Sequence, residues 1–161
     1  MRAGILIAMA AVAGVAVAAD LNYDEFIPLD AEALAETGLK PAYEELLPRL
    51  KKYVASPAAV SERIDSDAPS YAVSCLGTEY PIYAKGDQDE SWGRATFALF
   101  DIVNRQLAKT PYRFFAINGG NDLGGMFLTP AQAEAAKKSL PRKQDWPYLP
   151  TANKPWYGQY H

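Results

Sequence analysis

The chain has 161 residues, of which 49% are hydrophobic and 22% charged, a composition typical of one globular domain rather than a disordered chain. Its net charge of −3 does not supply the basic surface that nucleic-acid binding requires. The single cysteine excludes a disulfide framework. The single histidine is the last residue, which excludes a Ser-His-Asp triad or a histidine metal cluster unless the tail folds back. We therefore expect no metal or other cofactor.

Residues 1–19 have the features of a secretory signal peptide. Arg2 supplies a positive charge, an uncharged run rich in alanine and valine follows, and small residues at alternate positions precede Asp20. An uncleaved membrane anchor is the alternative, but the apolar run is shorter than the about 20 residues that a span needs. Cleavage near Ala18 or Ala19 predicts a bacterial periplasmic protein with no membrane span. Loss of Arg2 makes the mature chain more acidic.

Caps and apolar spacing predict helices in the N-terminal part of the mature chain. Asp30 caps a short helix that Gly38 ends, and Pro41 suits the first turn of a second helix. Pro48 is expected to kink or interrupt the second helix, because proline lacks the backbone N–H that a helix uses. Residues 56–64 begin with a serine and a proline in the order of a cap and a first turn, which predicts a third, short helix.

After these helices the sequence takes on the character of strands. Ser70–Leu76 and Glu79–Ala84 are the predicted strands, and Gly77-Thr78 is the predicted hairpin turn between them. Pro81 indicates an edge strand, since proline cannot donate to a sheet ladder. Cys75 lies in an apolar stretch, so we expect a buried, unreactive thiol, with an intermolecular disulfide as the alternative.

A long helix is predicted next, from a cap at Ser91 to about Leu107. Trp92, Ala95 and Leu99 recur at helical spacing and form the start of an apolar face, which predicts packing against a sheet.

The stretch from Tyr112 to Ser139 predicts a strand, a turn, a second strand and a helix. Aromatic and β-branched residues favour strands at Tyr112–Ile117 and Leu123–Leu128. Asn118–Asp122 contains residues that tolerate positive φ and suit a turn. Thr129, followed by a proline and then a glutamine three residues after the cap, predicts a capping box and a helix.

The predicted fold class is therefore α+β. Residues 20–140 are expected to form a single domain with N-terminal helices and a small antiparallel-rich sheet of about four strands, with two helices packed on it. Residues 141–161 contain four prolines and five aromatic residues and are predicted to form an extended C-terminal arm. We expect the arm to pack on the domain and bury its aromatic side chains; the alternative is an aromatic surface for a partner or a sugar.

Two sequence motifs invite a ligand interpretation, and both lack a required part. Asp87–Ser91 begins like a calcium loop, but Trp92 stands where the loop needs glycine and Ala98 where it needs glutamate. Asn118–Gly125 is rich in glycine but has no lysine and leads into a strand, which argues against a phosphate loop. Its last two glycines are explained by a bulge or close helix packing, or by an open strand face that accepts a partner element.

The chain shows no catalytic set, because its carboxylates lie in exposed-looking helices and loops. We therefore expect a small periplasmic, non-enzymatic binding protein, of the inhibitor or immunity type, that occludes a basic toxin or cell-wall hydrolase. The alternatives are a peptidoglycan-binding module, with Trp146, Trp156 and Tyr157 as stacking platforms, and, less favoured, an envelope enzyme. The predicted partner-binding residues are Asn118, Asn121, Asp122, Trp146, Tyr148, Trp156 and Tyr157.

Overall fold

A computed structural model describes residues 21–161 and has the predicted α+β class. The predicted signal peptide lies outside the described residues. Within them the four α-helices are α1 (Ala31–Glu36), α2 (Leu39–Leu50), α3 (Ser91–Gln106) and α4 (Pro130–Ser139).

The described strands form two antiparallel sheets of three strands, rather than one sheet of about four. The first sheet has the order β1-β6-β5, and the second has the order β2-β3-β4. The first contains β1 (Ile27–Pro28), β6 (Gly124–Leu128) and β5 (Arg113–Ile117). The second contains β2 (Ser61–Asp65), β3 (Ser70–Cys75) and β4 (Thr78–Tyr83). Sequence patterns did not reveal β1 or β2.

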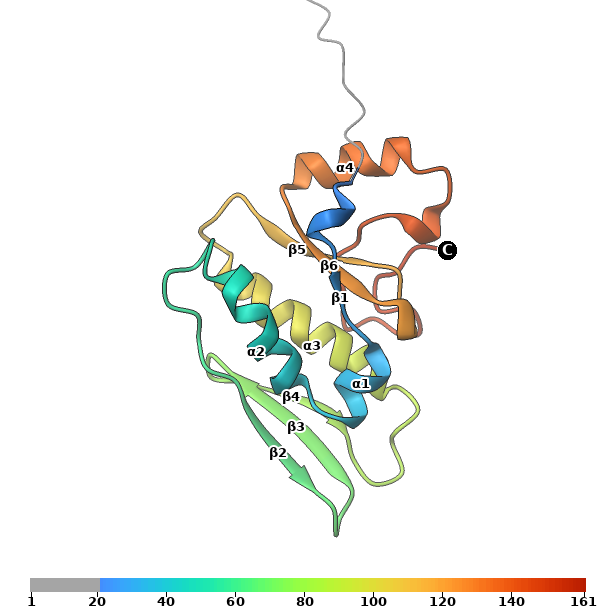
Figure 1. The fold of residues 1–161 in the computed structure, drawn as a ribbon. Helices are drawn as coiled ribbons and strands as arrows, with labels where there is room; N and C mark the ends of the chain where they lie inside the picture. Colours follow the sequence, from blue (N-terminus) through green and yellow to red (C-terminus); the bar gives the residue numbers. More distant parts are fainter. Residues whose placement is uncertain (1–20) are drawn as a thin grey trace, which may run out of the picture.

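The helices α1, α2 and α3 lie between the two sheets, and α4 lies beyond the first sheet (Figure 1). Helix α3 contacts both β4 and β5, which explains why residues on several sides of it are buried. Leu99, Phe100 and Ile102 are all fully buried, and the ring of Phe100 stacks on that of Phe114 with centroids 4.6 Å apart. This helix therefore joins the two sheets into one core.

The cap of α1 and the start of α2 confirm the sequence predictions, but the interruption that was one of the two effects predicted for Pro48 does not occur. The Oδ1 atom of Asp30 accepts a hydrogen bond of 3.1 Å from the backbone N–H of Ala33. Gly38 has a φ of 125°, a conformation that side chains rarely adopt. Helix α2 continues through Pro48 to Leu50. The proline removes one intrahelical hydrogen bond, the one to the carbonyl of Glu44, and the helix ends two residues later.

The predicted third helix at residues 56–64 is also wrong, because the segment contains no helix and its last four residues belong to β2. Both backbone groups of Ala58 bond to distant side chains. Its N–H donates to Gln106 Oε1 at 2.7 Å, and its carbonyl accepts from the Tyr43 hydroxyl at 2.7 Å. Ser61–Asp65 then pairs with β3 as an edge strand. Tertiary contacts override the local helix signal here.

The hairpin between β3 and β4 is confirmed, with a turn one residue earlier than predicted. Leu76 and Gly77 are its central residues, with φ of 50° and 74°, and Cys75 pairs with Thr78. Two positive φ values correspond to a type I′ turn. Pro81 lies in edge strand β4, as predicted. The thiol of Cys75 is buried, and burial raises its pKa.

The strand–turn–strand–helix unit near the C-terminus is confirmed, including the capping box of Thr129. Its glycine pair is neither bulged nor open to a partner element. A Cβ atom on Gly125 would overlap the ring of Phe114, and one on Gly124 would overlap the ring of Phe26. Both glycines are buried in β6, the central strand of its sheet. They therefore make room for aromatic core side chains.

Candidate functional site

The C-terminal arm is attached to the edge of the first sheet through Tyr148. The backbones of Tyr148 and Ala116 exchange two hydrogen bonds of 2.8 and 3.0 Å. The Tyr148 hydroxyl donates to the carbonyl of Asn118 at 2.8 Å, and burial raises the pKa of this phenol. The arm is thereby fixed beside β5 and beside the turn that follows β5.

Further along the arm, the ring of Tyr157 lies against Gly93 in the first turn of α3. A Cβ atom at position 93 would overlap this ring, so glycine is required for the contact. Tyr157 has a φ of 49°, in the left-handed region, which costs a non-glycine residue about 1–2 kcal/mol. Its backbone is held by bonds to Asn153 and Thr151 at 2.8 and 2.9 Å. The fold thus holds Tyr157 in a strained position.

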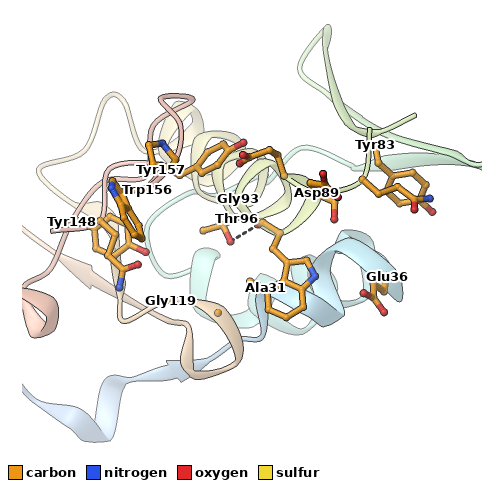
Figure 2. Close-up of a pocket in the computed structure, with 17 residues that line it drawn as sticks. Ala31, Glu36, Tyr83, Asp89, Gly93, Thr96, Gly119, Tyr148, Trp156 and Tyr157 are labelled. Carbon is orange, nitrogen blue, oxygen red and sulfur yellow. Dashed lines mark hydrogen bonds between the residues drawn. The ribbon is translucent and has the colours of Figure 1, made fainter. Parts of the chain in front are cut away.

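A groove of about 720 Å³ lies where the arm, the loop before α3, the start of α3 and helix α1 meet (Figure 2). In Figure 2, Trp156 and Tyr148 lie on one side of it, Asp89 and Glu36 on the other, and Tyr157 between them. Its lining residues are Ala31, Glu36, Tyr83, Gln88, Asp89, Glu90, Ser91, Trp92, Gly93, Thr96, Gly119, Gly120, Tyr148, Pro155, Trp156, Tyr157 and Gln159.

Five aromatic side chains line the groove, and two of them are exposed. Trp156 is 58% exposed and Trp92 is 38% exposed, values far above those of the core residues. The ring of His161 packs on Trp156 with centroids 3.8 Å apart. The carbonyl of Trp92 accepts a hydrogen bond from the Thr96 hydroxyl at 2.8 Å, shown as a dashed line in Figure 2. Large exposed aromatic faces are characteristic of binding surfaces.

The groove is acidic. Glu36, Asp89 and Glu90 line it, no lysine or arginine does, and none of the three carboxylates has a salt bridge within residues 21–161. Arg94 follows Gly93 in α3 but does not line the groove. Its guanidinium bonds to Asp87 Oδ1 at 2.7 Å and to the backbone carbonyl of Ile82 in β4 at 3.0 Å. This ion pair raises the pKa of Arg94 and lowers that of Asp87.

The hydroxyl of Tyr157 is the one buried side-chain polar atom without a hydrogen-bond partner in residues 21–161. Tyr157 is only 6% exposed. Burial, together with the Glu90 carboxylate, raises the pKa of Tyr157 to about 12, while Arg94 acts in the opposite direction. Both charged groups influence the phenol, but neither meets the geometry of a hydrogen bond with it.

The predicted partner-binding residues fall into three places. Tyr148, Trp156 and Tyr157 line the groove. Asn118, Asn121 and Asp122 instead line a separate hollow of about 510 Å³ on the turn before β6. Gly119 and Gly120 of the same turn face the groove, so the two surfaces are adjacent.

Trp146 belongs to neither surface. Its indole N–H donates to the carbonyl of Leu140 at 3.1 Å, and its ring packs edge-on against Tyr160. In the hollow, Asn121 donates to Glu32 Oε2 at 2.8 Å and therefore connects the turn to α1.

Several groove residues were not among the partner-binding residues predicted from the sequence. The helical spacing predicts Trp92 on the apolar face of its helix, but this residue is partly exposed at the groove. Glu36 and Tyr83 carry no local signal that distinguishes them from other surface residues. Asp89 and Glu90 lie in the stretch that begins like a calcium loop, but that pattern does not indicate that they face an aromatic groove. The one available signal was Gly93, a glycine inside a helix, where it is unfavourable by about 1 kcal/mol relative to alanine.

Within residues 21–161, no three histidine, cysteine, aspartate or glutamate side chains are grouped so that they could hold a metal ion. None of the helices in this range combines the length and apolar character needed to cross a bilayer. Comparison with known proteins found no matching family model, curated protein or solved structure.

Proposed function

We propose that this chain is a non-enzymatic periplasmic binding protein of the inhibitor or immunity type. It occludes a basic partner protein, such as a toxin or a cell-wall hydrolase, and the groove is its docking site. The observation that carries the proposal is one groove that combines exposed aromatic faces with three carboxylates, none of which has a salt bridge within residues 21–161.

Each part of this combination favours a protein partner with a basic surface. Complementary charge speeds association and suppresses wrong partners. Tryptophan and tyrosine in partly enclosed sites supply most of the binding energy in many interfaces. The groove offers both beside a fixed backbone, since Tyr148 and Tyr157 are anchored by hydrogen bonds.

A stable interface covers about 800 Å² on each partner and extends beyond one groove. The adjacent turn at residues 118–122 provides the next surface, because Asn121 and Asp122 are exposed. We therefore place these residues at the rim of the proposed interface and the groove at its centre.

A peptidoglycan-binding module is the second candidate, and it is supported by the exposed ring of Trp156. The other two residues expected as platforms offer little free surface. Tyr157 is buried and Trp146 is held by Leu140 and Tyr160. One exposed aromatic platform is weaker support for sugar binding than the acidic groove is for the binding of a basic protein.

Affinity capture with the chain from Asp20 onward tests the proposal. Wild type, Trp156→Ala and Leu149→Ala are exposed in parallel to envelope and secreted extracts. Leu149 is an exposed residue of the same arm and does not line the groove, so it controls for loss of an apolar side chain. We expect one stoichiometric protein on wild type and on Leu149→Ala, and much less of it on Trp156→Ala.

Two outcomes contradict the proposal. Equal capture by all three baits would place the partner elsewhere on the surface. Retention of the bait on insoluble cell wall, with no protein partner, would favour the peptidoglycan-binding module.

A further inference from the structure

We propose that the groove binds the guanidinium group of an arginine side chain that the partner inserts between Trp156 and the carboxylates. The inference rests on the proposed function and specifies which chemical group the groove recognises. Three features of the groove, the unpartnered hydroxyl, the carboxylates and the aromatic faces, point to this group.

The first feature is the hydroxyl of Tyr157, a residue more than nine-tenths buried; this hydroxyl has no hydrogen-bond partner in the part of the chain that the structure describes. A buried polar group without a partner is unfavourable, so such groups in folded proteins call for an explanation. Tyr157 lines the groove, and its pKa of about 12 keeps the phenol protonated at neutral pH. A neutral phenol oxygen can accept a hydrogen bond from a ligand N–H.

The second feature is the set of carboxylates beside this hydroxyl. Asp89 and Glu90 precede α3 directly, and both line the groove without a salt bridge to any of the described residues 21–161. The cation nearest to them along the helix, Arg94, is paired with Asp87 and also acts on the Tyr157 phenol, whose pKa it lowers. A guanidinium carries five N–H donors, so it can bond a carboxylate and the Tyr157 oxygen at the same time.

The third feature is the aromatic surface. Trp156 and Trp92 present exposed indole rings to the groove. A guanidinium is planar and weakly hydrated, so it stacks on an aromatic face while it bonds a carboxylate in its own plane. The ammonium of lysine is compact and strongly hydrated and gains less from such a site. These properties favour arginine over lysine.

Nuclear magnetic resonance titration tests the inference directly. The probes are N-acetyl-arginine methylamide, the matching lysine compound and the matching citrulline compound, which keeps the shape of arginine without its charge. The indole N–H signals of Trp92 and Trp156 report on the groove. The signal of Trp146 is an internal reference, because its N–H is bonded to Leu140 outside the groove.

We expect the arginine probe to shift the Trp92 and Trp156 signals saturably, with a dissociation constant at least about fivefold lower than that of the lysine probe. The citrulline probe should bind about tenfold more weakly or not at all, because it lacks the charge. Tyr157→Phe should weaken arginine binding about tenfold, since it removes an acceptor for a charged donor. Tyr23→Phe removes an exposed hydroxyl outside the groove and should have no effect.

Equal binding of citrulline and arginine, or binding unaffected by Tyr157→Phe, would overturn the inference. No shift with any probe would overturn it as well. The proposed function has a separate readout, which is the dependence of partner capture on Trp156. A groove-dependent partner together with no arginine preference leaves the proposed function standing and removes only this inference.

Discussion

The ring of Tyr157 lies against the bare Cα of Gly93, and this contact joins the C-terminal arm to the start of α3. Both residues line the groove. The groove therefore forms only while the arm packs on this turn of α3. Substitutions at the contact can be compared for their effects on the free energy of unfolding and on partner affinity.

Gly93→Ala tests this contact in a double-mutant cycle with Tyr157→Ala. In the wild-type background the new methyl group overlaps the ring and should lower the free energy of unfolding by about 1–3 kcal/mol. In the Tyr157→Ala background the overlap is gone, and alanine should raise the stability by up to about 1 kcal/mol through its higher helix propensity. Urea unfolding of the four proteins measures the reversal of sign. The same effect in both backgrounds would show that the ring does not rest on Gly93.

Tyr157→Phe should separate function from stability. Removing a buried hydroxyl that has no partner should raise the free energy of unfolding by about 1 kcal/mol or more. The same change should weaken partner binding, because the ligand loses its acceptor. Thermal unfolding and partner affinity of one preparation give both values. A less stable variant would mean that the hydroxyl has a partner within the fold.

The pH dependence of stability offers an independent test of the Tyr157 environment. Its pKa rises from an ordinary 10.0 to about 12, so the folded state holds the phenolic proton more tightly than the unfolded state. Its contribution to stability is complete below pH 10.0 and is lost as the pH rises through about 12. Wild type should therefore lose more stability than Tyr157→Phe over this interval. Burial also raises the pKa of other tyrosines, but these are common to both proteins. Parallel curves would contradict the environment described for Tyr157.

Gly125→Ala should damage the fold without changing the binding surface. A methyl group there overlaps the ring of Phe114, which is fully buried between Phe100 and Phe127. We expect the free energy of unfolding to fall by about 1–3 kcal/mol. Partner affinity per folded molecule should remain that of wild type, because Gly125 does not line the groove. Loss of affinity without loss of stability would instead support a binding role for the glycine pair.

The sequence predicted those elements whose signals lie within a few residues of each other. Asp30 and Thr129 cap their helices as expected, because a cap bonds its own first turn. Strand β2 was not predicted, because the segment before it is held by side chains from distant helices. Tyr43 and Gln106 bond the backbone of Ala58 in that segment.

The candidate site could be predicted only in part, for the same reason. The aromatic residues of the arm attracted attention by composition, and three of them line the groove. Which acidic residues face them depends on how the arm packs on α3. That packing rests on the contact between Gly93 and the ring of Tyr157, which are far apart in the chain and show no shared pattern.

The most direct test of the account compares partner affinity between two charge-matched variants. Asp89→Asn with Glu90→Gln removes two groove carboxylates. Asp24→Asn with Glu45→Gln removes two exposed carboxylates that lie outside the groove and have no salt bridge within residues 21–161. Calorimetric titration with the captured partner should show affinity about tenfold or more weaker for the groove variant and nearly unchanged for the control. Equal affinities of the two variants would contradict the claim that the acidic groove binds the partner.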